Sequence, residues 1–127
     1  MCNIHIIRKE DYLLRRFPIS ESRSDFYKVI NGKKIPSSFA FKTKRGENGL
    51  SVNIKVLTQD LQDFMIDPSS YSAVEFLAEI PLSSGHDCVH DPFPAEESKN
   101  GAHALILGDT GKLAKKLSKN CAVIENV

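Results

Sequence analysis

The amino-acid sequence predicts one α+β domain, residues 1–127, in which a mostly antiparallel sheet is combined with two main helices. Residues 50–56 and 73–80 alternate apolar and polar side chains with a period of two, the pattern of half-buried strands. Residues 59–66 and 111–119 instead carry apolar side chains at helical spacing. A chain of 127 residues is long enough to bury one hydrophobic core but not two, so we expect a single compact domain.

The first half of the chain predicts short extended elements separated by turns. Asn31 and Gly32 form a dipeptide that favours the tight turn of a β-hairpin. Pro18 restricts the residue before it and ends the segment that precedes it. In chain order, we expect a strand at 3–8, an apolar and cationic segment at 12–17, a polar loop at 20–25, a strand at 26–30 and an extended piece at 36–41.

The second half contains the clearest strand of the chain. Leu50, Val52, Ile54 and Val56 alternate there with polar residues, so one side of the strand should be buried. The elements expected after it are a helix at 59–66 that Thr58 caps, a strand at 73–80 that Pro81 ends, a loop at 91–101, a strand at 102–107, a helix at 111–119 with an apolar stripe of Leu113, Ala114 and Leu117, and a short strand at 121–124. The apolar faces of 50–56, 73–80 and 102–107 are expected to share one antiparallel sheet.

Charge is distributed unequally along the chain, although the formal net charge is only +1. Residues 1–45 hold eleven Lys or Arg and four Asp or Glu, whereas residues 46–127 hold six and twelve. A polyanionic partner would therefore meet the N-terminal half. The alternative is that the two halves pack together and neutralise each other, because a pI near 7.7 is not the strongly basic signature of a dedicated nucleic-acid binder.

The cysteines and the N-terminal segment bear on the compartment. Cys2, Cys88 and Cys121 are an odd and sparse set without the paired spacing of a disulfide scaffold, which suits a reducing environment. The apolar run 4–7 is interrupted by His5 and followed by charged residues, so it is neither a signal-peptide core nor a membrane span. We expect free thiols, a cytoplasmic location and no membrane partner.

Three of the four histidines lie within the eighteen residues 86–103, which makes this segment the first candidate for chemistry. On an extended strand His86, Cys88 and His90 would point the same way, and His103 could complete a zinc site. Alternate residues of a strand are, however, nearly 7 Å apart (about 3.3 Å per residue), an awkward reach for one tetrahedral ion, and the spacing matches no familiar zinc module. We therefore predict neither a metal nor a cofactor.

Acid–base chemistry is the second interpretation of the same segment. Histidine titrates near neutral pH, so His90 or His103 could transfer protons if an aspartate oriented the ring and arginines held a phosphate or carboxylate. The structural alternative is that His90-Asp91-Pro92 forms an Asx-type turn. Both alternatives stay open at the level of sequence.

Arginines and serines in the N-terminal half are candidate anion ligands. Arg15 and Arg16 lie between apolar residues, where arginine either forms an internal pair or clamps an anion with its planar fork. The tandem hydroxyls of Ser37 and Ser38 serve either a backbone turn or a bound oxyanion.

Five short motifs resemble, in the same order, those of a group of small bacterial proteins of similar length. They are LRR at 14–16, PSSFAF at 36–41, GLSV at 49–52, HDP at 90–92 and HALIxG at 103–108. The resemblance spans nearly the whole chain and implies a stand-alone bacterial domain, but it assigns no activity. Its polar members are Arg16, Ser38, Ser51 and His103, while His86 and Cys88 lie outside the pattern.

Two classes of function follow. In the first, the protein is a small enzyme that acts on RNA, a nucleotide or another phosphorylated ligand, with His103 as general acid or base and Arg16 stabilising negative charge. The residues expected to bind the ligand are Arg15, Ser38, Ser51 and His90. In the second, the protein is a non-catalytic interaction or accessory module of a bacterial operon. Convergence of these side chains on one cleft would favour the enzyme, and scatter would favour the module.

Overall fold

The computed structural model describes residues 5–44, 47–58, 69–91 and 101–124. The strands are β1 (Tyr12–Pro18), β2 (Tyr27–Ile30), β3 (Lys33–Pro36), β4 (Gly49–Ile54), β5 (Tyr71–Leu77), β6 (Cys88–His90), β7 (His103–Leu107) and β8 (Ala122–Val123). The α-helices are α2 (Glu79–Ser83) and α3 (Leu113–Lys119), and the 3-10 helices are η1 (Glu21–Phe26), η2 (Ser38–Phe41) and η3 (Lys55–Leu57). In the part of the chain so described, no helix has the length and apolar character needed to cross a membrane.

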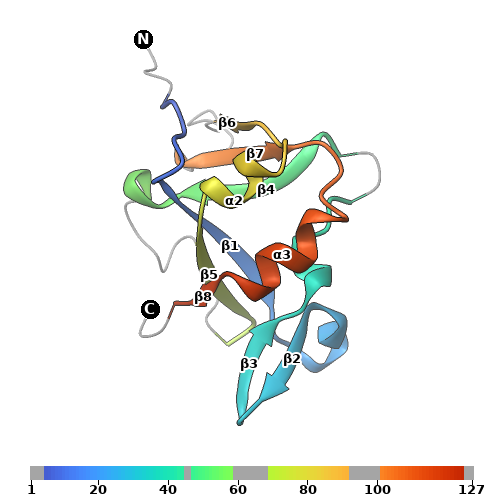
Figure 1. Ribbon diagram of the computed structural model, residues 1–127. Coiled ribbons are helices and arrows are strands. Elements are labelled where there is room, and N and C mark those ends of the chain that lie inside the picture. Colours follow the sequence, from blue (N-terminus) through green and yellow to red (C-terminus); the bar gives the residue numbers. More distant parts are fainter. Residues whose placement is uncertain (1–4, 45–46, 59–68, 92–100, 125–127) are drawn as a thin grey trace.

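Six of these strands form one antiparallel sheet in the order β6-β7-β4-β1-β5-β8, and β2 and β3 form a separate hairpin that projects from the body (Figure 1). The predicted strands around residues 50–56, 73–80 and 102–107 therefore share one sheet. Val52 lies opposite Ala104, and both are buried in the main hydrophobic cluster. The α+β fold with a mostly antiparallel sheet is confirmed.

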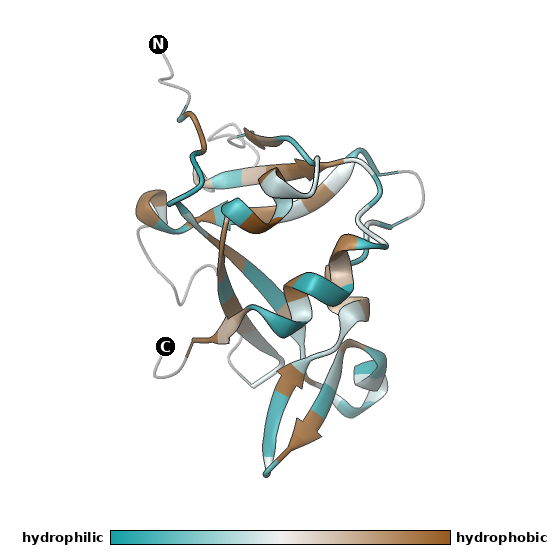
Figure 2. Cartoon of the chain, in the orientation of Figure 1, coloured by the Kyte–Doolittle hydropathy of each residue, from teal (hydrophilic) through white to brown (hydrophobic). Residues whose placement is uncertain are grey.

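Helix α3 covers one face of this sheet. Its predicted apolar stripe, Leu113, Ala114 and Leu117, is buried together with sheet residues in the main hydrophobic cluster. Figure 2 shows the amphipathic character of the helix, with hydrophilic residues along its outward side. Complete burial of each leucine side chain contributes about 1.5–3 kcal/mol. A helix this short is not stable by itself, so packing against the sheet stabilises α3.

The opposite face of the sheet carries the polar side chains of the candidate site. Strand register places Leu14, Asn53 and His103 in one row across β1, β4 and β7. Ser51 lies opposite Leu105 in the next row. Residues directly opposite one another in an antiparallel sheet point to the same face, and alternate residues of a strand share that face. Ser51 and His103 therefore point to the face away from α3.

The hairpin follows the local sequence. Asn31 and Gly32 adopt positive φ values of 53° and 79°, as a two-residue type I′ turn requires. β2 and β3 pair from Tyr27 opposite Pro36 to Ile30 opposite Lys33. The turn predicted from the Asn-Gly dipeptide is confirmed.

Three predicted elements in the first half differ from the structure. Residues 5–8 are not a strand, because the backbone N–H of His5 donates to the ring of His90 and not to a neighbouring strand. Residues 36–41 are not extended: β3 ends at Pro36, and η2 follows, with the Ala40 N–H donating to Ser37. The predicted polar loop at 20–25 is mostly the 3-10 helix η1.

Other boundaries shift or fall elsewhere. The strand predicted at 73–80 ends at Leu77, because the Ala78 N–H donates to the carbonyl of Asp11 and α2 begins at Glu79. The predicted helix at 59–66 and most of the predicted loop at 91–101 lie outside the described residues.

Gly49 marks a close approach between β4 and β7 and supplies a test of the register. A Cβ at this position would lie 2.5 Å from the backbone oxygen of Ile106, so part of the sheet would have to move. We expect Gly49→Ala to lower the free energy of unfolding by about 1–3 kcal/mol in urea denaturation. Gly101→Ala is the matched control, because its Cβ meets nothing within 4 Å. Equal stability of the two variants would contradict the close approach.

Candidate functional site

His103 and Ser51 are in hydrogen-bond contact on the face away from α3. The Nε2 atom of His103 lies 3.2 Å from Ser51 Oγ, although the two residues are 52 positions apart. The contact follows from the pairing of β4 with β7, in which Ser51 is the diagonal neighbour of His103. Ser51 is exposed, whereas His103 is only 6% exposed. The imidazole is therefore buried behind a hydroxyl that solvent or a ligand can reach.

Asp91 determines which nitrogen of His103 carries the proton. His103 Nδ1 lies 2.9 Å from the backbone carbonyl oxygen of Asp91. A carbonyl oxygen only accepts, so Nδ1 must carry the proton and Nε2 is left as the acceptor for the Ser51 hydroxyl. The Asp91 carboxylate oxygen Oδ2 lies 3.5 Å from the same Nδ1, and the Asp91 N–H donates to the His103 carbonyl at 2.8 Å. Asp91 therefore orients the imidazole through its carboxylate and through its backbone hydrogen bonds with His103.

This arrangement consists of a serine hydroxyl, an imidazole whose Nε2 faces that hydroxyl, and a carboxylate on the far side of the ring. Such a constellation recurs on unrelated folds and is recognised by geometry and not by chain position. The imidazole can take the Ser51 proton through Nε2, with the Asp91 carboxylate oxygen 3.5 Å from Nδ1 on the other side of the ring. The chemistry available here is nucleophilic attack by Ser51 on an electrophilic phosphorus or carbonyl carbon.

Arg15 fixes the backbone of the nucleophile's strand. Its Nη1 donates to the carbonyl of Ser51 at 2.8 Å, and its Nε donates to the carbonyl of Ala40 at 2.9 Å. Burial, together with the positive charge of Arg16, lowers the pKa of Arg15 to about 10. The guanidinium remains charged at neutral pH, so a positive charge lies against the backbone carbonyl of Ser51.

Arg16 points to the same face of the sheet as Ser51 and His103. It is two residues along β1 from Leu14, which lies opposite Asn53 on that face. Its guanidinium carbon lies 5.0 Å from the centroid of the Tyr71 ring. Arg16 therefore lies on the same face as Ser51 and His103, with its planar group against an aromatic ring.

His90 and Ser38 lie apart from this arrangement. His90 is opposite Ala104, so it points to the face opposite that of His103. Its Nε2–H donates to the Gly101 carbonyl at 2.7 Å, and its Nδ1 accepts from the His5 N–H at 2.8 Å. Ser38 belongs to η2, which packs with α3 on the core face. The structure brings Ser51 and His103 together, joins Arg15 to the Ser51 backbone carbonyl, places Arg16 on the same face of the sheet, and leaves His90 and Ser38 elsewhere.

The residues considered for zinc do not converge. Cys88 and His90 share the core face of β6, whereas His103 points to the other face. Burial, with the nearby charge of Asp87, raises the pKa of the Cys88 thiol to about 12, which disfavours the thiolate that zinc requires. Within residues 5–44, 47–58, 69–91 and 101–124, no three His, Cys, Asp or Glu side chains are placed to hold one ion.

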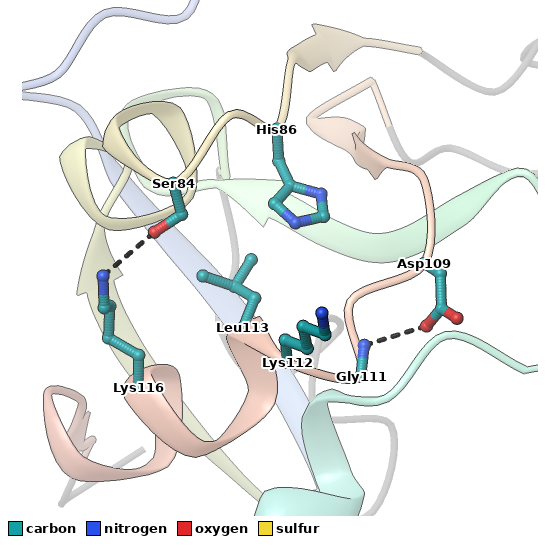
Figure 3. A pocket seen from close by; sticks show the side chains of 7 residues that line it. All are labelled: Ser84, His86, Asp109, Gly111, Lys112, Leu113 and Lys116. Carbon is teal, nitrogen blue, oxygen red and sulfur yellow. Dashed lines mark hydrogen bonds between the residues drawn. The ribbon is translucent and has the colours of Figure 1, made fainter.

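A separate hollow of about 570 Å³ lies beside α3, and none of the residues predicted for the site lines it (Figure 3). Two of its polar contacts are internal: the Lys116 ammonium donates to Ser84 Oγ at 3.2 Å, and the Gly111 N–H donates to Asp109 at 2.9 Å. The residues that line it are Ser84, His86, Asp109, Gly111, Lys112, Leu113 and Lys116. This hollow is distinct from the Ser51–His103 arrangement.

Asp91 is the functional candidate that the sequence did not single out. It was expected only as part of a turn, and its role depends on β6 ending beside the start of β7, which the residue pattern does not specify. The general expectation of an aspartate that orients a histidine was the only available signal. Comparison of the chain with protein-family models, with curated proteins and with solved structures finds no match, so its resemblance to small bacterial proteins stays a prediction.

Proposed function

We propose that this protein is a small phosphoesterase that acts on RNA, a nucleotide or another phosphorylated ligand. One observation carries the proposal: the His103 ring binds Asp91 through Nδ1 and the Ser51 hydroxyl through Nε2. An imidazole in this tautomer accepts a proton from the serine without any rearrangement of the ring. Ser51 is assigned as nucleophile, His103 as general base and acid, and Asp91 as the positioning residue.

The reaction proceeds in two balanced steps. Ser51 Oγ attacks phosphorus while its proton moves to His103 Nε2, and the bond from phosphorus to the leaving oxygen breaks. The imidazolium then gives its proton to that oxygen, which leaves as an alcohol. Water then attacks phosphorus while its proton moves to the now neutral His103, and the bond from phosphorus to Ser51 Oγ breaks. The imidazolium returns this proton to Oγ, which restores the Ser51 hydroxyl and releases the phosphate product. Each proton transfer by a positioned side chain contributes about 10²–10⁴ in rate.

Positive charge around Ser51 supports an anionic substrate. Arg15 donates to the Ser51 carbonyl, and Arg16 points to the same face as the serine hydroxyl. Arginine pairs bidentately with phosphate, and a hydrogen bond to a charged group contributes about 1.5–3 kcal/mol. Arg16 is assigned to stabilise the charge that develops on the phosphoryl oxygens.

The alternative is an interaction module without catalysis. The observation that favours it is that Arg15 and His90 use their side chains to bind backbone groups, which is a structural role. A cytoplasmic location and a bacterial origin complete the proposal; they rest on the sparse, unpaired cysteines and on the resemblance of the motifs.

Covalent labelling with diisopropyl fluorophosphate tests the nucleophile without knowledge of the substrate. We expect mass spectrometry of the digested protein to find one phosphoryl adduct, on Ser51, formed much more slowly in His103→Gln. Ser118→Ala is the matched control, because the Ser118 hydroxyl donates only to the Lys115 carbonyl among its described contacts. Labelling of Ser51 at the same rate in His103→Gln, or no labelling of Ser51, would favour the interaction module.

A further inference from the structure

Three cation–aromatic pairs lie close together on η1, the β2–β3 hairpin and the segment around η2. The Arg23 guanidinium carbon is 4.7 Å from the centroid of the Phe26 ring. Lys34 Nζ is 4.9 Å from the Tyr27 ring centroid, and Lys42 Nζ is 6.0 Å from that of Phe39. We call these six residues the cation–aromatic cluster. Each pair places a positive charge beside a flat ring.

Two of the three pairs are in direct contact with each other. The rings of Phe26 and Phe39 are in edge-to-face contact, with centroids 4.7 Å apart. The Ser37 N–H donates to the Phe26 carbonyl at 3.0 Å, which ties the end of η1 to the start of η2. Phe39 is 45% exposed, so part of its ring faces outward, whereas Phe26 and Tyr27 are partly buried and pack against the hydrophobic core.

The charge of this region is strongly positive. Residues 19–44 contain six Lys or Arg and two Asp or Glu, a balance of +4. This excess lies in the N-terminal half of the chain, for which the charge distribution predicts a polyanionic partner. Charge complementarity therefore favours a partner that carries regularly spaced negative charges.

A single side chain links the cluster to the proposed catalytic serine. Arg15 donates to the carbonyl of Ala40, the neighbour of Phe39, and to the carbonyl of Ser51. The two hydrogen bonds join η2 to the backbone of β4. Because η2 packs with α3 on the core face and the Ser51 hydroxyl points away from it, the cluster and the hydroxyl lie on different faces of the sheet.

We infer that the cation–aromatic cluster binds single-stranded nucleic acid, with bases on the aromatic rings and phosphates on the lysines and arginine. Unpaired bases stack on exposed aromatic side chains, whereas paired bases in a duplex are unavailable for this contact. An acidic peptide would satisfy the charges but has no planar groups for the rings. The inference rests on the proposed function and names its substrate class: a phosphodiester in single-stranded RNA or DNA.

Fluorescence anisotropy of the full-length protein with short fluorescein-labelled oligouridylate, oligothymidylate and duplex DNA tests this inference. Phe39→Leu keeps an apolar side chain but removes the ring, and we expect it to weaken binding of either single strand about tenfold. Lys42→Ala should reduce the dependence of log K on log salt by about 1. We expect the duplex to bind more weakly than the single strands. Comparison of the two single strands shows whether RNA or DNA is preferred.

Two controls match these variants. Tyr12→Leu removes another exposed ring that also lies under a lysine, with Lys55 Nζ 5.3 Å from its centroid, but at the opposite end of β1. Lys119→Ala removes an exposed charge from the last turn of α3. Wild-type binding by Phe39→Leu and Lys42→Ala, or equal losses in the controls, would overturn the inference. His103→Gln should bind the oligonucleotides like wild type. A loss of turnover with normal binding in this variant therefore tests the proposed catalysis, whereas a loss of binding in Phe39→Leu and Lys42→Ala tests the cluster.

Discussion

Replacing His103 with glutamine is expected to lower kcat/KM for hydrolysis of a single-stranded oligonucleotide by about 10³-fold. Glutamine can still donate and accept hydrogen bonds, but it cannot take the Ser51 proton across the 3.2 Å contact that Nε2 now makes. The loss should fall on kcat, because His103 is buried behind Ser51 and takes no part in the proposed binding surface. Product formation is measured by gel electrophoresis under single-turnover conditions.

Asp91→Asn provides the comparison for this variant. The backbone carbonyl of Asp91 still accepts from His103 Nδ1 in the variant, so the tautomer is retained and only the carboxylate charge 3.5 Å away is lost. We expect a smaller reduction in kcat than in His103→Gln and no change in KM. Thermal unfolding of both variants checks that the fold is intact. Turnover of His103→Gln at the wild-type rate would exclude His103 as the base.

Val52→Asp is expected to prevent folding. Val52 is 2% exposed, lies opposite Ala104 in the centre of the sheet and belongs to the main hydrophobic cluster. Burial of a carboxylate among these apolar side chains costs several kcal/mol, comparable with the ~5–15 kcal/mol by which a domain of this size is stable. Far-UV circular dichroism measures the loss of secondary structure, and gel filtration measures the loss of the compact state.

Val29→Asp is the matched control for Val52→Asp. Val29 also lies on a strand, but it is 60% exposed on β2, so a carboxylate there stays in water. We expect this variant to fold, with a free energy of unfolding within about 0.5 kcal/mol of that of wild type. A folded Val52→Asp protein would mean that the core face of β4 is assigned to the wrong side of the sheet.

Much of the fold could be predicted because local patterns and tertiary packing agree. The apolar residues at alternate positions of β4 and β7 are buried in the core, the apolar stripe of α3 meets the sheet, and Asn31-Gly32 forms the expected turn. The errors arise where a tertiary contact overrides local preference. Phe41 is buried in the core, and residues 38–41 form η2 instead of continuing the strand that ends at Pro36.

The candidate site was less predictable, because its geometry depends on strand register. Ser51 and His103 were both named from the sequence, but their contact requires that β4 and β7 pair in one register. A shift by one residue would send one side chain to the opposite face. The same effect separates His90 from His103, which look equivalent in the sequence. Arg15 could not be recognised as a ligand of the Ser51 backbone, because that contact joins residues 36 positions apart.

The tautomer of His103 is the most direct test of the central claim that this ring accepts the Ser51 proton. Two-dimensional NMR of ¹⁵N-labelled protein, with assignment by His103→Gln, distinguishes a protonated from an unprotonated ring nitrogen. We predict that the neutral ring carries its proton on Nδ1, where the Asp91 carbonyl accepts it, and that Nε2 is unprotonated. A neutral ring protonated on Nε2 would donate to Ser51 instead of accepting from it, and would contradict the proposed role of His103 as the base.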